Sequence, residues 1–481
     1  MVLRKLRSKG FSLLVFAGFF IAISFIALIS LPNLRGGNIL NFLFSFFLAS
    51  GAYIFAIFRL KYDRLSIKSI FIFAIIFRIT LFFTTPSLSD DDYRYIWDGH
   101  IFNGGINPYA FHVNSPLLDN FATPFRALVN HDWMASPYLP TSQLIFAIVE
   151  SIIPQSLLAF QITAAIFDLL TGWLILDILR VLGLRKQNIL IYLWNPLVII
   201  EFSHSAHVDA LMIFLMMLAF WFLVKRNLFG SVIALATATL TKFLPILLVP
   251  IFWWRWDLKR RALFIAILLV ALGLFIPGAG LGIFGASDGT GIFGALRIYL
   301  QSWNYNSGIY HWLEIWISGY PTVGAVPVEI VGKRPILIAK AIMTALLGLT
   351  GLLTAWLAWR TENSAEKISN ERDLTQIRLA TLPLGAYLLF AATIHPWYVT
   401  LIIPLLPFLL PKDSESPYIK LFLYPWVYFS IAVALSYLTY LDPENLRETA
   451  WVRALEYIPL YIFLGYAFLK TALKKSKKTT A

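Results

Sequence analysis

The chain of 481 residues contains no cysteine and few charged side chains. Without cysteine it can form neither a disulfide framework, a thiolate zinc site nor a cysteine nucleophile. Charged residues make up 14% of the chain, whereas soluble proteins carry about a quarter. No glycine-rich nucleotide-binding pattern, internal repeat or low-complexity tract is evident. These absences argue against a soluble, disulfide-stabilised or nucleotide-binding protein.

Hydrophobic residues are abundant: they form 59% of the chain, the mean hydropathy is +0.72, and there are 40 Phe and 16 Trp. Apolar runs recur from end to end, and a run of roughly 20 residues can cross a bilayer. The first run, Phe11–Leu31, is too long for a signal peptide and lacks a cleavage site, so it is predicted to be a membrane helix. We therefore expect one integral-membrane domain over residues 1–481.

Thirteen apolar segments are candidates for membrane helices. They are Phe11–Leu31, Ile39–Leu60, Ile67–Thr84, Gln155–Leu182, Gln187–Phe202, Val208–Val224, Leu228–Trp256, Ala262–Pro277, Pro335–Trp359, Leu379–Ile394, Tyr398–Leu410, Leu421–Tyr440 and Val452–Leu469. Pro245 and Pro250 interrupt Leu228–Trp256, so this long segment is expected to bend back as two short helices. The prediction is an all-α polytopic bundle of about 14 transmembrane helices.

Basic residues predict the orientation, because cytoplasmic loops are enriched in lysine and arginine. They cluster at 59–68, 180–186, 225–226, 255–261, 360–378 and in the tail at about 470–481. We interpret the net charge of +13 in this way, not as a sign of nucleic-acid binding. Both termini are then cytoplasmic. Two long segments, about 85–155 and 278–334, fall outside, and Thr141–Ile153 is predicted to be a helix lying at the outer interface.

The first outer loop opens with three adjacent acids, Asp90, Asp91 and Asp92. Neighbouring carboxylates repel, so at least one pKa should rise unless a cation is near. One of them could deprotonate a sugar hydroxyl as a general base, or they could hold a divalent metal such as Mg or Mn. The alternative is a solvated acidic loop or a helix N-cap, and the residues alone leave both open.

A second polar cluster follows the motif Trp194-Asn195-Pro196-Leu197. Its members, predicted in and beside a short outer turn, are Glu201, His204, His207 and Asp209. A metal site is one interpretation, and a polar wall facing a substrate is the favoured one. Lys242, between apolar neighbours, could neutralise a lipid phosphate or simply snorkel. Arg78 and Asp168 could pair inside the membrane.

Two aromatic stretches complete the candidates. Trp303, Asn304 and Asn306 could grip a sugar through apolar faces and amide hydrogen bonds, or belong to an interfacial aromatic belt. In His395-Pro396-Trp397-Tyr398, the histidine could bind a phosphate oxygen or have a structural role.

These motifs, in this order, resemble a known family. The acids followed by Tyr93-Arg94-Tyr95-x-Trp97-Asp98-Gly99, then Gly-x-Asn107-Pro108-Tyr109, are similar to the first outer loop of bacterial polyprenyl-phosphate-sugar-dependent glycosyltransferases of the GT-C superfamily. The Trp194–Leu197 and Thr241-Lys242-Phe243 motifs and His395–Tyr398 fit the same mannosyltransferase-like group. Asp92 departs from the pattern, because members often have an aliphatic residue there, and this blurs which acid is the base.

The resemblance implies a GT-C-like bundle with an outer catalytic cavity in the inner (plasma) membrane. It implies an inverting transfer of a hexose, mannose by family habit, from a polyprenyl-phosphate-sugar donor to a glycan, lipid or other acceptor. The favoured base is Asp91, then Asp90, then Asp92. The expected ligands of the donor phosphate are Lys242, His395 and Arg94. The expected substrate contacts are Asp98, Trp97, Asn107, Tyr109, Glu201, His204, His207, Asp209, Trp303, Asn304, Asn306, Trp397 and Tyr398.

Beyond the donor, the acceptor and membrane lipids, no partner is expected, and no cofactor other than the divalent metal already considered. Two alternatives stay open: a transporter or flippase for lipid-linked sugars, and an enzyme that ligates or polymerises whole oligosaccharides. A transporter should show inverted repeats around a midplane site. The absence of a repeat and the gathering of polar clusters on one face favour the transferase.

Overall fold

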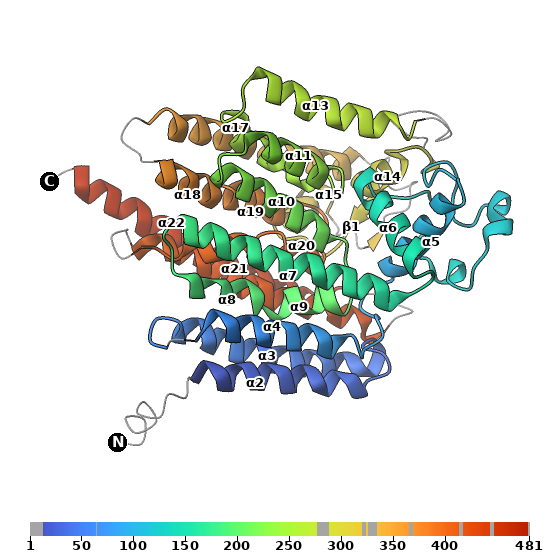
Figure 1. The fold of residues 1–481 in the computed structure, drawn as a ribbon, viewed down its shortest axis with the longest axis horizontal. Helices are drawn as coiled ribbons and strands as arrows, with labels where there is room; N and C mark the ends of the chain where they lie inside the picture. The colour runs from blue at the N-terminus through green and yellow to red at the C-terminus, as the bar shows by residue number, and fades with distance from the viewer. Residues whose placement is uncertain are drawn as a thin grey trace.

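The computed structural model describes residues 13–63, 65–276, 288–319, 324–325, 334–364, 369–412, 417–442 and 447–479. This part of the chain is a bundle of helices, most of which run roughly alongside one another (Figure 1). The two short strands in it, β1 (Trp303–Asn304) and β2 (Gly324–Ala325), pair antiparallel. The predicted all-helical class is confirmed for the described residues.

The α-helices are α2 (Leu13–Ile26), α3 (Ile39–Arg59), α4 (Ile67–Leu81), α5 (Asp91–Asn103), α6 (Pro140–Ile152), α7 (Leu157–Val181), α8 (Leu190–Leu193), α9 (Pro196–Ser203), α10 (Asp209–Val224), α11 (Leu228–Thr239), α12 (Val249–Trp253), α13 (Leu258–Gly273), α14 (Gly294–Ser302), α15 (Ile309–Ser318), α17 (Arg334–Glu362), α18 (Ser369–Leu379), α19 (Thr381–Phe390), α20 (Pro396–Val399), α21 (Leu423–Ala432) and α22 (Ala450–Thr479). The 3-10 segments are η1 (Ala27–Ser30), η2 (Gly36–Asn38), η3 (Pro116–Phe121), η4 (Arg126–Leu128), η5 (Lys186–Ile189), η6 (Leu244–Leu248), η7 (Ile403–Leu409), η8 (Pro417–Phe422) and η9 (Val433–Leu441).

Six helical segments of the described chain are long and apolar enough to cross a membrane. They are Leu13–Ser30, Gly36–Arg59, Leu157–Val181, Ile336–Glu362, Tyr418–Leu441 and Ala450–Leu473. Four shorter apolar helices accompany them, Asp209–Val224, Leu228–Thr239, Leu244–Trp253 and Pro396–Leu409. The protein is therefore an integral membrane protein with several spans, while the count of about 14 stays a prediction.

The long apolar segment Leu228–Trp256 is broken, as its prolines predicted. Helix α11 ends at Thr239, the chain turns, and η6 and α12 follow with Pro245 and Pro250 near their starts. Proline is well tolerated there because the first helical N–H groups have no intrahelical acceptor. The break places Lys242 in the turn.

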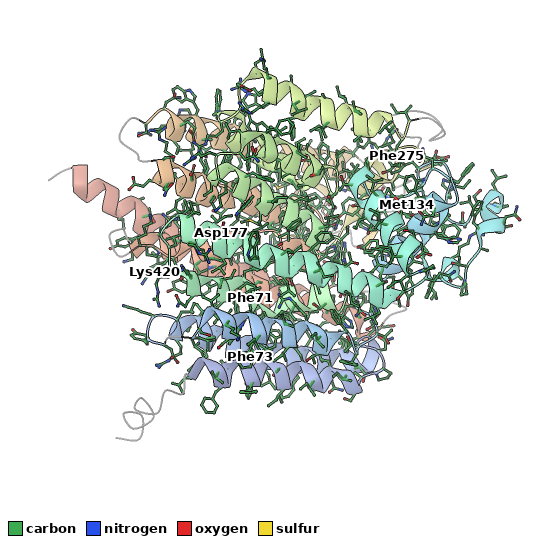
Figure 2. All side chains as sticks on the ribbon, in the orientation of Figure 1. Phe71, Phe73, Met134, Asp177, Phe275 and Lys420 are labelled. Carbon is green, nitrogen blue, oxygen red and sulfur yellow. The ribbon has the colours of Figure 1, made fainter. Side chains whose placement is uncertain are left out.

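Helices α5 and α6 pack against each other at one end of the bundle, beside α14 (Figure 1). Gly99 permits this contact, because a Cβ there would lie 2.5 Å from the carbonyl oxygen of Phe146. The chain enters α2 and leaves α22 at the opposite end (Figure 1). Figure 2 likewise places Met134 and Phe275 near α5 and α6, and Lys420 at the other end. That α5 and α6 lie outside the cell stays a prediction.

The Trp194–Leu197 motif is part of the packed core. The Asn195 side chain accepts hydrogen bonds from the N–H groups of Leu197 and Val198 and so caps α9, with Pro196 in the first turn. Next to it, Nε of Arg78 lies 2.6 Å from Oδ2 of Asp168, and both side chains are buried. This confirms the predicted pair, and satisfying both charges is what makes them tolerable inside the bundle.

Candidate active site

The three acids at the start of α5 have different surroundings. Asp92 is fully buried, whereas the side chains of Asp90 and Asp91 are 38% and 20% exposed. Burial, assisted by its two acidic neighbours, raises the pKa of Asp92 well above its usual range. Its Oδ2 has no hydrogen-bond partner in the described chain. Burial therefore favours the protonated form of Asp92, and its two neighbours are the acids that reach solvent.

Asp90 is engaged by a cation from a distant part of the sequence. Both of its carboxylate oxygens lie 3.1 Å from terminal nitrogens of Arg35, in the loop between α2 and α3. Asp90 is the N-cap residue of α5, but its side chain makes no capping hydrogen bond. Its charge is therefore directed to Arg35 and not to the helix.

Asp91, the first residue of α5, points toward the turn between α9 and α10. Its Oδ1 accepts a hydrogen bond of 3.2 Å from the amide of Asn130, and its Oδ2 lies 3.8 Å from Nδ1 of His207. On the far side of that ring, Nε2 lies 3.4 Å from Oε2 of Glu201, whose Oε1 accepts from the hydroxyl of Tyr437. The predicted acids of the first loop and of the second cluster are thus brought together.

His207 belongs to a stack of four rings. Its imidazole lies on Trp397 with centroids 4.1 Å apart, Trp397 lies on His395 at 4.4 Å, and His395 lies on Tyr305 at 4.7 Å. Tyr305 is held beside His395 by backbone hydrogen bonds to Ala392 and Ile394. Burial lowers the pKa of His207 well below its usual range and that of His395 to about 3. Both rings are neutral at physiological pH.

Lys242 also reaches this region. Its ammonium lies 2.6 Å from Oδ2 of Asp209, at the start of α10, and 5.3 Å from the ring centre of Tyr398. The hydroxyl of Tyr398 is 2.6 Å from that of Tyr299 in α14. Oδ1 of Asp209 has no hydrogen-bond partner among the described residues. Lys242 is therefore held in place by one carboxylate and one aromatic face.

Several predicted contact residues bind the protein itself. The buried guanidinium of Arg94 donates to the carbonyl oxygens of Asn130, His131 and Met134, and thereby fixes the loop that carries Asn130. Asp98 accepts from Ser136 and Gln143, and burial raises its pKa. Arg94 and Asp98 therefore hold the loop beside the site in place.

The remaining predicted contacts of the first loop have similar roles. The amide of Asn107 donates to the carbonyl oxygen of Phe275, and the hydroxyl of Tyr109 donates to the backbone carbonyl oxygen of Tyr138. Trp97 is buried, with the Arg126 guanidinium 5.2 Å from its ring centre. His204 lies 2.7 Å from the hydroxyl of Thr84. None of these side chains is directed at Asp91 by a contact that the structure describes.

The second predicted loop, 278–334, is described over 288–319 and 324–325, and its other residues lie outside the described chain. Trp303 stacks on Trp133 and contacts His131 edge to face, with ring centres 6.4 and 4.8 Å away, and both partners belong to the first loop. Asn304 donates to Glu314, and Asn306 donates to Glu448 and Glu456. The tryptophan therefore joins the two loops, while the asparagines anchor the second loop.

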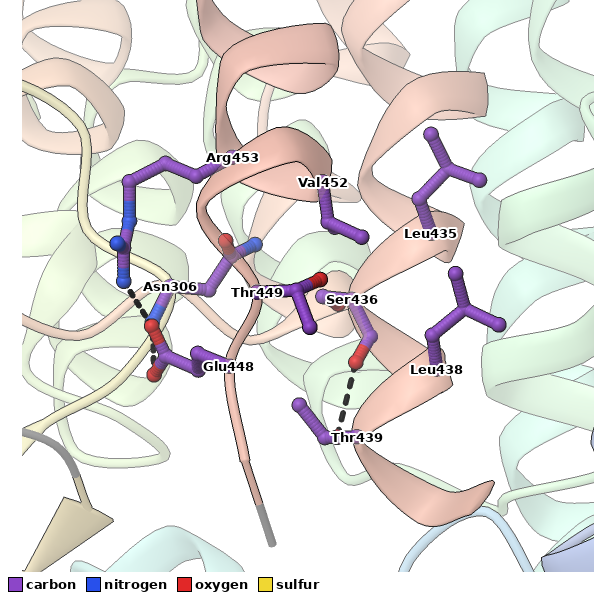
Figure 3. Close-up of a pocket in the computed structure, with 9 residues that line it drawn as sticks. All are labelled: Asn306, Leu435, Ser436, Leu438, Thr439, Glu448, Thr449, Val452 and Arg453. Atoms are coloured by element: carbon purple, nitrogen blue, oxygen red, sulfur yellow. Dashed lines mark hydrogen bonds and ion pairs between the residues drawn. The ribbon is translucent and has the colours of Figure 1, made fainter.

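Asn306 also borders a small hollow between η9 and the start of α22 (Figure 3). Leu435, Leu438 and Val452 form its apolar wall, and Glu448 and Arg453 pair with each other across from them (Figure 3). Asn306 also donates to Glu448, so these polar contacts attach the second loop to the start of the last helix.

Metal ligation was the alternative for both polar clusters. No group of three or more His, Asp or Glu side chains placed to hold a metal ion occurs within the described ranges. The chemistry available from these residues is that of a carboxylate base beside neutral imidazoles and a paired lysine.

Comparison with known proteins adds a family. Residues 23–258 match the family described as "Alpha-(1->6)-mannopyranosyltransferase, N-terminal domain". This match covers just under half of the chain, and over that region the chain is similar to the alpha-(1->6)-mannopyranosyltransferase family. The matched region includes Asp90–Asp92, the turn with His207, and Lys242, and it ends before Tyr305 and His395.

A curated relative has a name similar to that of the family. Alpha-(1->6)-mannopyranosyltransferase A of Corynebacterium glutamicum is 27% identical to this chain over 190 residues. The match covers 37% of this chain and 36% of the relative, so the chain spans about a third of that protein's length. No solved structure matches the chain.

Sequence reasoning missed three residues of the site. Arg35, Asn130 and Tyr437 bind Asp90, Asp91 and Glu201 respectively. One signal could have found the first of them. Arg35 is a basic residue in a loop that the predicted topology places outside, where lysine and arginine are uncommon. An arginine in an outer loop is therefore a candidate partner for the acids of the neighbouring outer loop.

Proposed function

We propose that this membrane protein transfers mannose from a polyprenyl-phosphate-linked donor to a mannose-containing glycan, with Asp91 as the general base. The printed names of the family and of the Corynebacterium glutamicum relative support mannose and a 1→6 linkage. The ordered motifs from Asp90 to Tyr398, which resemble GT-C enzymes, support a lipid-phosphate donor. The active site faces the outside of the cell membrane in this proposal, because lysines and arginines cluster in the loops assigned to the inside.

The observation that carries the proposal is the position of Asp91. It is the partly exposed acid of the three that faces a neutral imidazole, 3.8 Å away, and it stands at the first residue of a 13-residue helix. A helix N-terminus favours negative charge, so it is a suitable place for an acidic side chain. A carboxylate that is ionised, oriented and reachable is what removal of a hydroxyl proton requires.

The reaction balances with the residues that the site offers. Asp91 takes the proton of the acceptor's primary hydroxyl at C6 while that oxygen forms a bond to the anomeric carbon of mannose. The bond from the anomeric carbon to the phosphate oxygen breaks, and lipid phosphate leaves with the electron pair. Attack from the opposite side inverts the anomeric carbon. An α-linked product therefore requires a β-linked mannosyl phosphate.

Lys242 is placed to receive the leaving phosphate. The Lys242 side chain is 17% exposed, and its ammonium is already oriented by Asp209 and Tyr398. An approaching phosphate competes with Asp209 for it, and charge that develops on the phosphate as the bond breaks strengthens this contact. Neutral His395 can add a hydrogen bond but no charge.

The test is an assay of the purified protein with β-mannosyl polyprenyl phosphate and an α-(1→6)-mannan oligosaccharide. Release of lipid phosphate with an equal amount of α-linked product supports the proposal. A β-linked product contradicts inversion. If no lipid phosphate is released while the lipid-linked sugar crosses vesicle membranes, the protein is a transporter of lipid-linked sugars instead.

A further inference from the structure

Arg35 links the N-terminal hairpin to the acids of α5. It lies in the loop between α2 and α3, 55 residues before Asp90, and its two terminal nitrogens contact the two carboxylate oxygens at 3.1 Å each. Such a two-point contact between guanidinium and carboxylate is the strongest geometry that an arginine can make. The loop between the first two helices thus places a cation beside the acids of α5.

Arg35 is held from a second side as well. Its guanidinium lies over the ring of Tyr440 in η9, 4.6 Å from the ring centre. Its Nε is buried and has no hydrogen-bond partner among the described residues. An arginine stacked on one ring and paired with one carboxylate keeps a fixed place, because both contacts restrict its rotamers.

The consequence lies in the three acids. Asp92 is fully buried, and burial raises its pKa and so favours its protonated form. Asp90 faces Arg35. Asp91 remains as the carboxylate that carries a charge without an arginine or lysine contact in the described chain. Two adjacent ionised carboxylates destabilise each other unless a cation compensates one of them.

We propose that Arg35 is a positioning residue of this site, which neutralises Asp90 and so allows Asp91, one residue on, to act as the ionised base. This inference rests on the proposed function, because it assigns a partner to the same base. Arg35 itself does not touch the reacting atoms. It acts through Asp90.

The Arg35 variants leave the other titratable groups around Asp91 in place. On its own helix these are Asp92, Arg94 and Tyr95. From the neighbouring elements they are His131, Tyr138, His207, Asp209, Tyr299 and Tyr440. Arg35, Tyr93, His131 and Tyr440 face Asp90 in turn. A change that follows only the Arg35–Asp90 charges is therefore distinguishable from a general change in the site.

The experiment compares pH profiles of kcat/KM for the full-length protein and four variants: Arg35→Gln, Arg35→Lys, Asp90→Asn and Arg35→Gln combined with Asp90→Asn. The acidic limb of such a profile reports ionisation of the essential base in the free enzyme. Arg35→Gln leaves an uncompensated charge beside Asp91, so the midpoint of this limb should move to higher pH by about one unit. Arg35→Lys should move it less.

The combined variant is the decisive one. Removing Asp90 together with Arg35 removes both charges. The midpoint of the acidic limb should then return to within about 0.3 pH units of the wild-type midpoint, whatever the maximal kcat/KM of the variant. Arg126→Gln is the matched control, because Arg126 contacts exposed Asp119 at 2.8 Å in the same loop. It should leave the limb in place.

Three results overturn the inference: an unshifted limb in Arg35→Gln, a limb that stays shifted in the combined variant, or an equal shift in Arg126→Gln. Thermal unfolding of each variant separates loss of fold from loss of rate. Failure of the proposed function looks different, since Asp91→Asn would then be active. If Asp91→Asn is inactive and the Arg35→Gln limb is unshifted, the inference about Arg35 alone is wrong.

Discussion

Oδ2 of Asp91 faces Nδ1 of His207 at 3.8 Å, across the gap between α5 and the turn that precedes α10. Nε2 of the same imidazole faces Glu201 at 3.4 Å. The ring is buried and neutral, and neither nitrogen has a hydrogen-bond partner among the described residues. Catalytic contacts that are long in the free enzyme often shorten when substrate binds. We expect this ring to orient the base.

His207→Gln should therefore lower kcat by about 10-fold or more, with a smaller change in KM for the donor. The reason is that the amide can replace one hydrogen bond of the imidazole but cannot bridge Asp91 and Glu201. The measurement is steady-state transfer with donor varied. His100→Gln is the control, because this partly buried histidine of α5 lies beside Glu150 and not beside Asp91. A fall in both variants alike would assign His207 a merely structural role.

Lys242 and Lys225 provide a matched pair of ion pairs. Lys242 contacts Asp209 at 2.6 Å among the candidate site residues, and Lys225 contacts Asp177 at 2.7 Å, in the charged region near α18 at the other end of α10. Lys242→Gln should raise KM for the donor by about 10-fold, because a phosphate loses its cation. Lys225→Gln should not. Equal KM values in both variants would contradict a phosphate site at Lys242.

The raised pKa of Asp92 has a consequence for stability. The pKa of the carboxyl has the ordinary aspartate value of 3.8 in the unfolded chain, and burial raises it in the folded protein. The unfolded chain then binds fewer protons, so stability is full below that value and falls as pH rises through the folded pKa. Asp92→Asn removes this loss, because the amide carries no charge.

The unfolding temperature of Asp92→Asn relative to wild type should accordingly increase between pH 5 and pH 8. Asp132→Asn, at an exposed position of the same loop, should show a constant difference. Thermal unfolding in detergent at several pH values checks both. A pH-independent difference for Asp92→Asn would mean that the buried carboxyl is not protonated.

Trp397 lies between His207 and His395, with ring centres at 4.1 and 4.4 Å. Trp397→Leu removes both stacking contacts, each worth about 1 kcal/mol beyond burial, and should lower kcat by about 10-fold through misplaced imidazoles. Trp397→Phe keeps an aromatic face and should recover part of the loss. Trp316→Leu, at an exposed position in α15, serves as control. No recovery with Phe would point to the indole N–H instead of the ring face.

The sequence predicted the helical class, the break near Lys242 and the Arg78–Asp168 pair. These follow from local pattern: apolar length, proline, and charge inside an apolar run. It did not predict which polar side chains would be used internally. Asn304 and Asn306 have the composition of a sugar-binding loop, yet their amides bind glutamates.

Arg35 is a residue whose role was not predicted from the sequence. Its place in a loop predicted to lie outside is the one signal in the sequence, and it does not name the partners. Asp90 follows 55 residues later and Tyr440 lies near the end of the chain. The family match helps little there, since it ends at residue 258, before Tyr440. Only the packing of η9 and α5 against the first hairpin brings the three together.

The central claim, that Asp91 is the base for transfer from a lipid-phosphate donor, is tested most directly by one comparison of initial rates. Purified wild type, Asp91→Asn and Asp119→Asn are assayed with labelled β-mannosyl polyprenyl phosphate and an α-(1→6)-mannan oligosaccharide. Asp119 belongs to the same loop but is exposed and paired with Arg126. We predict that Asp91→Asn loses about 100-fold or more of the rate, with unchanged unfolding temperature, while Asp119→Asn stays within about twofold. A rate for Asp91→Asn close to that of wild type would contradict the account.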